Sequence, residues 1–170
     1  MTTQAEATSI KPTAVRSIVP CLTFNDQAEE AINFYVSLFA NSRILSLVRS
    51  EGDGPHPKGK VLHAEFELNG QRYTAMDGGP TFQFAPGFSL VVTCETQEEI
   101  DTIWAALTDG GQEGPCGWLT DRFGLAWQVV PAVLGQMMGD STSGNQQKLL
   151  EALLTMTKID IATLERAYKE

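Results

Sequence analysis

The chain has 170 residues, an apolar fraction of 42% and a formal net charge of −9. This length and composition suit one compact domain, or two fused half-domains that share a core, and they exclude a disordered chain. The negative charge repels phosphate backbones and anionic lipid surfaces, so neither nucleic acid nor a membrane is an expected partner. No run of residues approaches the roughly 20 apolar positions that span a bilayer.

The N-terminus and the cysteines indicate the compartment. Residues 1–14 are polar and lack the apolar core of a signal peptide, so we expect a disordered leader. The three cysteines, Cys21, Cys94 and Cys116, are odd in number and lack metal-ligand spacing. This usage favours reduced thiols over a disulfide framework, and therefore a cytoplasmic protein.

A strand and a helix are predicted directly after the leader. Residues 16–24 are predicted to form a strand with Pro20, Leu22 and Phe24 on one face and Val19, Cys21 and Thr23 on the other. Pro20 lacks an N–H, which places this strand where that donor is not needed. Asp26 as N-cap and Glu29 three residues later match a capping box. Apolar residues then recur at helical spacing over 28–39.

A strand over 43–49, a flexible loop over 50–59 and a hairpin over 60–76 follow. Asn69-Gly70 is a strong type I′ turn signal and pairs Leu68 with Gln71. In that register the core face carries Leu62, Ala64, Phe66, Leu68, Tyr73 and Ala75. The opposite face carries His63, Glu65, Glu67, Arg72, Thr74 and Met76, a mixed set suited to the wall of a wet pocket.

The second half is predicted to contain a connector, a strand, a helix and two short strands, over 77–87, 88–94, 96–107, 112–118 and 124–130. The connector is rich in glycine, proline and aromatic residues. Either Thr96 or Glu95 can cap the helix.

The two halves repeat one another. Residues 23–27 (TFNDQ) correspond to residues 93–97 (TCETQ), at an offset of about 70 residues, and both segments end an apolar strand and open a helix. Each half therefore contains a strand, a helix and about three strands. Two such units can join so that their sheets curve around a shared cleft while the helices pack outside. The alternative is a chance similarity between two capped helices.

These boundaries give a first module over 15–79, a second module over 80–135 and a C-terminal helical tail over 136–170. In the tail, leucines at helical spacing predict a helix over 146–157, and Asp160 can cap a last short helix. Because an apolar helix must cover something, the tail packs either on its own domain or on a second chain.

The sequence resembles the PhnB-like branch of the vicinal oxygen chelate (glyoxalase/bleomycin resistance/dioxygenase) superfamily over roughly residues 16–168. The likeness lies in Pro20-Cys21-Leu22-Thr23-Phe24, Ala28-Glu29-Glu30-Ala31, Phe34-Tyr35, His63-Ala64-Glu65-Phe66, Cys116-Gly117-Trp118-Leu119-Thr120-Asp121, Phe123-Gly124-Leu125-Ala126-Trp127-Gln128 and Lys158-Ile159-Asp160-Ile161. The resemblance implies an α+β fold in which paired βαβββ modules form a curved mixed sheet around a cleft, followed by C-terminal helices. It also implies a homodimer, often with exchanged modules.

The resemblance further implies a divalent metal held by His or Glu on cleft-facing strands. The corresponding positions here fall at Val19, Ser89, Gln128 and either Thr74 or Met76. Valine cannot bind a metal, and serine and neutral glutamine are weak ligands. We therefore expect no tightly bound metal and no cofactor.

The candidate pocket residues are Cys21, His63, Glu65, Thr74, Met76, Ser89, Trp118 and Gln128. His63 beside Glu65 suits a general base, or simply a hydrogen-bonded pocket wall. Trp118 can stack on a flat ligand, whereas Trp127 is expected in the core. Cys21 lacks a neighbour that would stabilise a thiolate, and no catalytic residue can be assigned.

Three functions remain open at this point. The leading hypothesis is a metal-free protein that binds an unidentified small molecule between its modules. The second is a lyase, isomerase or dioxygenase that recruits a metal through His63 and Glu65. The third is a structural or regulatory dimer without a ligand. Proteins of this branch are often labelled as quinone-type methyltransferases, but neither glycine-rich stretch, 77–79 or 109–114, lies between a strand and a following helix as a methyl-donor loop would.

Overall fold

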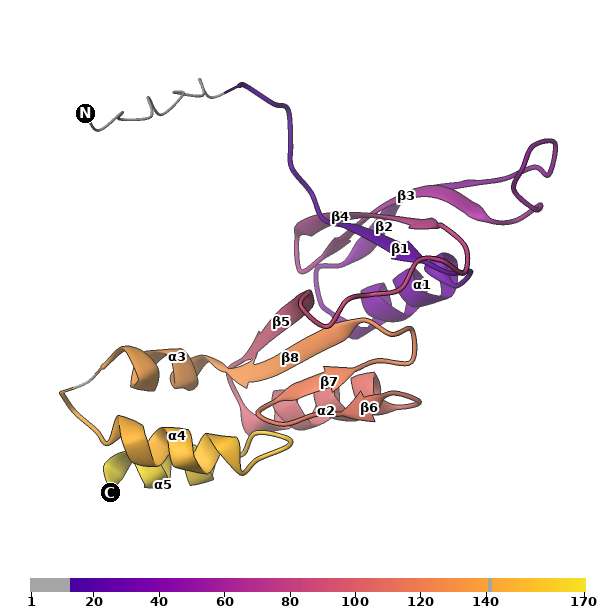
Figure 1. The fold of residues 1–170 in the computed structure, drawn as a ribbon. Coiled ribbons are helices and arrows are strands. Elements are labelled where there is room, and N and C mark those ends of the chain that lie inside the picture. The colour runs from indigo at the N-terminus through magenta and orange to yellow at the C-terminus, as the bar shows by residue number, and fades with distance from the viewer. Residues whose placement is uncertain (1–12, 141) are drawn as a thin grey trace, which may run out of the picture.

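The computed structural model describes residues 13–140 and 142–170, so most of the expected leader lies outside the described residues. The fold is α+β, with two βαβββ modules followed by a C-terminal helical unit (Figure 1). The first module contains β1 (Cys21–Phe24), α1 (Ala28–Leu38), β2 (Arg43–Arg49), β3 (Val61–Leu68) and β4 (Gln71–Asp77). The second contains β5 (Ser89–Cys94), α2 (Gln97–Thr108), β6 (Gln112–Glu113), β7 (Trp118–Thr120) and β8 (Ala126–Pro131). The C-terminal unit contains α3 (Ala132–Gly139), α4 (Gln146–Leu154) and α5 (Ile161–Lys169).

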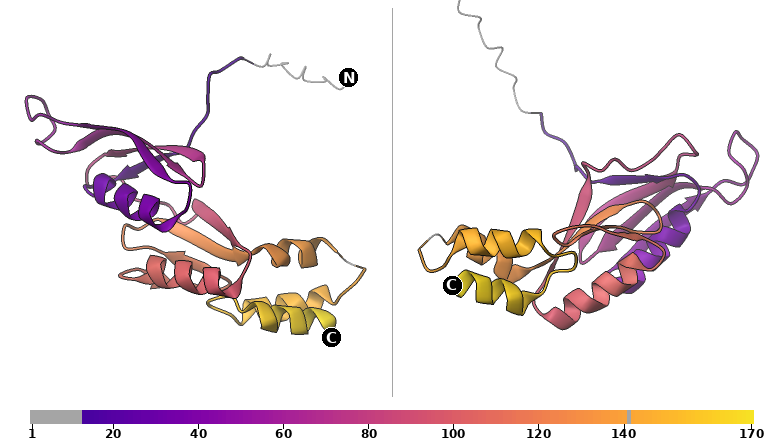
Figure 2. Two further views of the ribbon diagram at one scale, coloured as in Figure 1. Left: turned by 180° about the vertical axis from the view of Figure 1, so that it is seen from behind. Right: turned by 60° about the horizontal axis from the view of Figure 1, so that its bottom comes forward.

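The two modules have the same topology, which confirms the predicted repeat. The strand orders are β1-β4-β3-β2 and β5-β8-β7-β6, and in each sheet the first and last strands of the module pair in parallel. Both sheets are open, and α1 and α2 lie on the same side of the molecule (Figure 2). Pro20 precedes an edge strand, as its missing N–H predicts.

The β3–β4 hairpin has the predicted register, with Leu68 opposite Gln71 and Glu65 opposite Thr74. One predicted core residue is wrong, because Leu62 is 36% exposed and Val61 is buried instead. Along β3 the pairing with β2 skips Leu62, and this extra residue forms a β-bulge. A bulge reverses the alternation of side chains, so Val61 turns inward and Leu62 turns outward.

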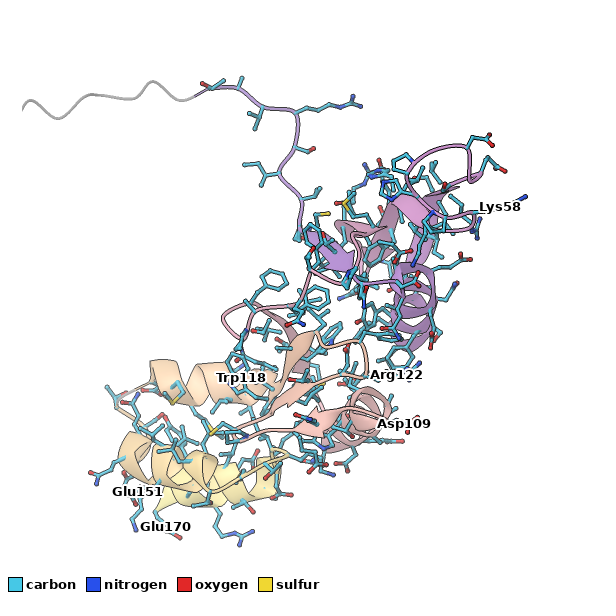
Figure 3. All side chains as sticks on the ribbon, turned by 45° about the vertical axis from the view of Figure 1, so that its right-hand side comes forward. Lys58, Asp109, Trp118, Arg122, Glu151 and Glu170 are labelled. Atoms are coloured by element: carbon cyan, nitrogen blue, oxygen red, sulfur yellow. The ribbon has the colours of Figure 1, made fainter. Side chains whose placement is uncertain are left out.

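One hydrophobic core continues through both modules. The Phe39 ring, just after α1, stacks on Trp127 of β8 with centroids 5.6 Å apart, and Trp127 is buried as predicted. On the same side, the Arg122 guanidinium lies 4.1 Å from the Phe34 ring centroid, a cation–π contact from the second module to α1 (Figure 3). The modules are therefore joined by packing as well as by the chain.

A buried carboxylate adds a polar link between the modules. Asp121 Oδ2 accepts the hydroxyl of Tyr35 on α1 at 2.6 Å and the indole N–H of Trp127 at 2.8 Å. Its Oδ1 accepts the backbone N–H groups of Phe123 and Leu125. Four donors compensate the burial of this charge. Burial and the adjacent carboxylate both raise the pKa of Tyr35, which keeps its hydroxyl protonated as a donor.

The predicted capping box of α1 is wrong. Asp26 pairs with the ammonium group of Lys60, and Glu29 pairs with the Arg49 guanidinium at 2.5 Å. The helix is capped instead by Asp77 at the end of β4, whose Oδ1 accepts the first N–H of α1 at 2.9 Å. The carboxylates of Asp26 and Glu29 thus form ion pairs with basic residues of neighbouring segments. The buried carboxylate of Asp77, which is distant in sequence, accepts the helix N–H instead.

The last strands of the second module differ from the prediction. A single strand was expected over 112–118, but β6 and β7 are separate there. Between them Cys116 and Gly117 have positive φ angles of 58° and 82°, so the backbone turns sharply. Thr96 caps α2 in a complete capping box with Glu99, in agreement with one of the two predicted caps.

The C-terminal unit has its own small core of Met137, Leu149, Ile159 and Leu164. Helix α3 was not predicted, and α4 ends three residues before the predicted boundary. Asp160 caps α5 through the Thr163 N–H, as predicted. No helix in the described part of the chain is long and apolar enough to cross a membrane.

Candidate functional site

Each sheet has one face covered by its helix and one face that the helix leaves free, which we term the open face. Five predicted candidates lie on the open face of the first module: Cys21 on β1, Thr74 and Met76 on β4, and His63 and Glu65 on β3. Cys21 lies beside Thr74, and Thr74 lies beside Glu65. The structure thus brings them together as one patch, with the mixed polar and apolar character that the sequence indicates.

His63 and Glu65 form the charged end of this patch. The His63 Nε2 atom lies 3.5 Å from Glu65 Oε1, and both side chains are about half exposed, at 51% and 46%. Solvent screens a pair with this exposure, so its contribution to stability is small. The pair remains available to a ligand, either as a proton acceptor and donor or as two ligands for a recruited cation.

The other three candidates lie on the open face of the second module. The Gln128 amide on β8 donates to the Ser89 hydroxyl on β5 at 2.9 Å, and Trp118 on β7 lies opposite Gln128. Trp118 is 36% exposed (Figure 3). The eight candidates therefore form two groups, one on each sheet, and the chain segment between β4 and β5 lies between them.

That segment is the predicted connector, and in the structure it spans residues 78–88. It forms part of three neighbouring hollows. One hollow, of about 220 Å³, is lined by Cys21, Thr23, Phe82, Gln83, Phe84, Ala85 and Phe88. A second hollow, of about 300 Å³, is lined on one side by the connector residues Phe84, Ala85 and Pro86. Its other lining residues include Trp118, Thr120 and Ala126 of the second open face. Phe84 and Ala85 belong to both. The third hollow, of about 320 Å³, has Phe82, Gln83 and Phe84 of the connector among its lining residues, together with Phe123 of the second module. The connector thus joins the edge of the first open face to the second.

The sequence analysis missed the three connector phenylalanines, Phe82, Phe84 and Phe88, and treated the segment only as a link. A signal was present, since three aromatic residues fall within seven positions of a segment without regular structure. Exposed aromatic residues on a loop commonly mark a binding surface.

The metal-binding positions expected from the fold do not carry a set of strong donors. Ser89 and Gln128 are already hydrogen bonded to each other, and Thr74 offers a neutral hydroxyl. In the described residues, no three or more His, Cys, Asp or Glu side chains are grouped as they would be around an ion. His63 and Glu65 are two such donors, one fewer than a typical site requires.

Two further hollows do not involve the connector. A groove of about 630 Å³ runs between the modules on the helix side, lined by Phe39, Leu68, Leu90, Ile103 and other largely apolar residues. Cys94 also lines it, and burial raises the pKa of this thiol to about 11, which keeps it protonated and unreactive near neutral pH.

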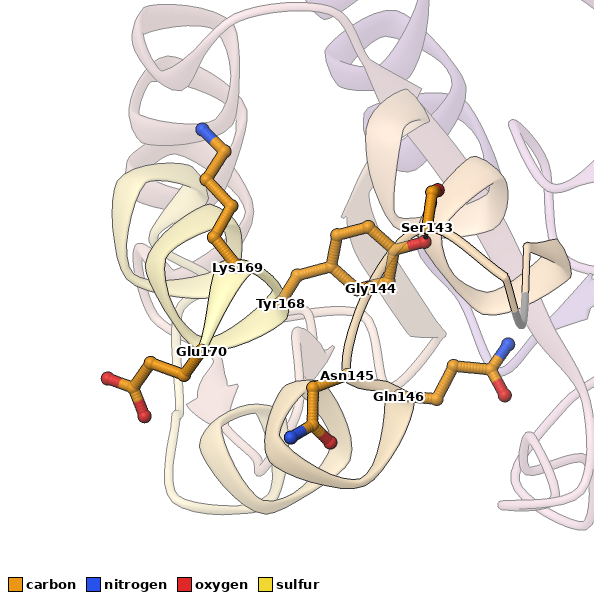
Figure 4. Close-up of a pocket in the computed structure, with 7 residues that line it drawn as sticks. All are labelled: Ser143, Gly144, Asn145, Gln146, Tyr168, Lys169 and Glu170. Carbon is orange, nitrogen blue, oxygen red and sulfur yellow. Dashed lines mark hydrogen bonds between the residues drawn. The ribbon is translucent and has the colours of Figure 1, made fainter.

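The last hollow, of about 530 Å³, lies in the C-terminal unit beside Tyr168 (Figure 4). The Tyr168 hydroxyl donates to the Asp140 carbonyl at 2.9 Å, and its carbonyl accepts the Asn145 N–H at 2.8 Å. The ring lies against Gly144, where any side chain would collide with it. These contacts fasten the linker after α3 to α5, which is a structural role.

Comparison with known families gives one model that matches, over residues 16–130, and its description is 3-demethylubiquinone-9 3-methyltransferase. The helices α3, α4 and α5 lie beyond this match. No curated protein was found to match the sequence.

Several solved structures are similar. A PhnB protein from Bacillus cereus is 42% identical, with a TM-score of 0.64, and the alignment covers 69% of this chain and 100% of that one. The protein PA1353 from Pseudomonas aeruginosa is 27% identical, with a TM-score of 0.58 and coverages of 69% and 98%. A FosX fosfomycin resistance protein from Listeria monocytogenes is 12% identical, with a TM-score of 0.50 and coverages of 68% and 92%. The last likeness concerns the fold alone.

Proposed function

Because the chain belongs to the 3-demethylubiquinone-9 3-methyltransferase family, a PhnB-like family of the glyoxalase/bleomycin resistance/dioxygenase superfamily, we propose that it binds a small organic molecule on the open faces of its sheets. The observation that carries the proposal is the exposure of these faces. Helices cover only one side of each sheet, and the free side presents mixed polar and apolar residues next to the connector hollows. Ligand sites combine a few polar groups with apolar walls in this way.

We further propose that a second copy of the chain packs on the open faces and encloses this site. Apolar side chains are exposed on both open faces, among them Val48 at 51%, Met76 at 38% and Val91 at 57%. Within the part of the chain that the structure describes, the edge strands β1 and β5 each pair with one neighbour. Exposed apolar surface and unpaired edges are features that an interface between copies would cover.

The ligand is held without a resident divalent metal in this proposal. The support is the chemistry of the donors at the expected positions, where Ser89 and Gln128 satisfy each other and Thr74 is neutral. Hydrogen bonds from Thr74, Gln128 and the His63–Glu65 pair would then orient the ligand. The weaker alternative, an enzyme that recruits a metal, is favoured only by the 3.5 Å approach of His63 to Glu65.

Methyl transfer is not part of the proposal. The segment 77–79 leads from β4 into the connector, and the segment 109–114 leads from α2 into β6. A methyl-donor or dinucleotide loop needs a strand followed by the N-terminus of a helix, where backbone N–H groups point at the ligand. Neither segment has that placement.

Native mass spectrometry of the purified full-length chain tests the proposal in one measurement. We expect a species of twice the 18.5 kDa chain mass that retains a small organic molecule and no stoichiometric divalent ion. Calorimetric titration with Mn²⁺ and Zn²⁺ provides the metal control, and His63→Ala provides a variant that removes the better metal ligand.

Each other outcome identifies a rival. One tightly bound divalent ion per chain, lost in His63→Ala, would establish the metal-recruiting enzyme. A dimer that retains no molecule, and binds none from a library of small organic compounds, would establish a structural protein and refute the proposal.

A further inference from the structure

We propose that the connector hollow, the 220 Å³ space lined by Phe82, Phe84 and Phe88, takes an uncharged planar ring system and rejects anions. This inference rests on the proposed small-molecule function and adds the class of ligand and the wall that selects it. Apart from Cys21, the residues that line this hollow are not among the expected metal and pocket positions.

The first support is that the aromatic wall is held in place. The Gly78 N–H donates to the Phe24 carbonyl at 2.8 Å, and the Phe88 N–H donates to the Ala85 carbonyl at 3.0 Å. The Phe84 ring packs edge-on against Phe24, with centroids 5.2 Å apart. The connector is thus anchored to the core of the first module rather than free in solvent.

The second support is the close packing of the Phe82 ring against the backbone at Gly78. A Cβ atom at Gly78 would come within 2.6 Å of Phe82 Cδ2 and 2.5 Å of Thr23 Cγ2, so only glycine leaves room for the ring. Phe82 is nevertheless 51% exposed, and Phe88 is 41% exposed. One side of the Phe82 ring is therefore seated on the backbone while part of it remains free to contact a ligand. Such preorganised aromatic surface suits a stacked ring.

The third support is the charge of the lining. None of the described residues that line the connector hollow is charged. The neighbouring 300 Å³ hollow has one, Glu113, whose Oε1 already accepts the Trp104 indole N–H at 3.0 Å. An anion that entered either hollow would lose part of its hydration without forming an ion pair with a lining residue. The net charge of −9 on the chain would also repel it.

A small planar molecule is the occupant that fits these observations. At about 220 Å³ the hollow is smaller than most ligand sites, and its polar groups are a thiol, a hydroxyl and an amide, on Cys21, Thr23 and Gln83. These groups can hydrogen bond to a phenol or a carbonyl on the ring. They offer no ionic contact.

A matched pair of probes tests this, namely 2-naphthol and 2-naphthyl phosphate, which share one ring and differ by the phosphate group. Titrated into the full-length chain at pH 7, 2-naphthol should bind, and its phosphate at least roughly tenfold more weakly. The double variant Phe82→Ala/Phe88→Ala should weaken 2-naphthol binding by about tenfold or more. Leu150→Ala/Leu154→Ala, which alters two exposed leucines on α4, should leave it unchanged.

A filling variant protects the test against misfolding. Ala85 is exposed, so Ala85→Trp should fold normally, occupy the hollow and block 2-naphthol. Thermal unfolding of each variant verifies that it is folded.

Four outcomes overturn the inference, and three of them leave the proposed function intact. In the first, the phosphate binds as tightly as the alcohol. In the second, the Phe82→Ala/Phe88→Ala and Ala85→Trp variants bind 2-naphthol normally while Gln128→Ala does not. In the third, the double variant turns a dimer into a monomer with unchanged affinity, which identifies the hollow as part of the interface. In the fourth, neither probe nor any retained molecule binds, and both proposals fail.

Discussion

Helices α1 and α2 occupy equivalent places in the two modules, yet their N-termini are held in different ways. In the first module, Asp77 lies at the end of β4 opposite Phe24, and its carboxylate accepts the N–H groups of Ala28 and Val61, each at 2.9 Å. In the second module, the corresponding position at the end of β8, opposite Cys94, is Pro131.

Proline offers no side-chain acceptor, so α2 depends on the local capping box of Thr96 and Glu99. Pro131 instead leads directly into α3 and the C-terminal unit. The residue at the end of the last strand therefore differs in role between the modules. Asp77 binds the N-terminus of the helix in its own module, whereas Pro131 leads the chain into the C-terminal unit. The repeat conserves topology but not the way in which its helix is anchored.

The link between the modules gives the largest expected effect. Asp121→Ala leaves the Tyr35 hydroxyl, the Trp127 indole and two backbone N–H groups without their acceptor, and it should lower the free energy of unfolding by roughly 4 kcal/mol. Urea denaturation measures this. Tyr35→Phe removes one donor of the four and should cost less than half as much. If Tyr35→Phe lowered the free energy of unfolding as much as Asp121→Ala, the Tyr35–Asp121 hydrogen bond alone would account for the stabilisation.

The remote cap of α1 gives the next effect. Asp77→Ala leaves two buried N–H groups unpaired, at the starts of α1 and β3, and should cost about 3 kcal/mol. Asp26→Ala is the matched control, since this exposed aspartate precedes the same helix but pairs with the Lys60 ammonium group instead of the helix N-terminus. It should cost less than about 1 kcal/mol. If the control were the more damaging change, the comparison between remote and local caps would be wrong.

The local cap of α2 gives a smaller effect. Thr96→Ala removes the hydroxyl that accepts the Glu99 N–H at 3.2 Å and should cost about 1 kcal/mol in urea denaturation. Thr96→Ser retains the hydroxyl and should restore most of this stability. Because Thr96 and Glu99 are exposed, water replaces part of the lost bond, which is why this cap is weaker than Asp77.

The local cap of α5 gives the smallest effect and depends on pH. Hydrogen bonds with Thr163 hold the pKa of Asp160 below its usual value. A carboxyl whose pKa is lowered by folding stabilises the folded state above its unfolded pKa, near 4. That stability is lost as the pH falls through the folded value.

We therefore expect slightly faster amide exchange in α5 below about pH 4, after correction for the intrinsic rate. Asp160→Asn still caps the helix but does not titrate, so this pH dependence should be absent in that variant. Unchanged protection of α5 in the wild-type chain down to pH 3 would contradict the expectation.

The candidate site was predictable in part. The Asn69-Gly70 turn sets the register of β3 and β4, and that register alone placed Glu65 beside Thr74. The sequence could not show that the eight candidates form two groups on separate sheets. Nor could it show that Phe82 is seated on Gly78, because this contact depends on where the connector crosses β1.

The sequence by itself determined the features that depend on neighbours along the chain. These are the paired βαβββ order, the alternation within strands, the cap at Asp160, and the choice of Thr96 or Glu95 as the cap of α2, since each rests on residues a few positions apart. Only the tertiary structure decided that Asp77 caps a helix 49 residues away, that Leu62 is turned outward by a bulge, and that Tyr35 meets Asp121. Those contacts join distant segments, and their geometry exists only once the sheets and helices have packed.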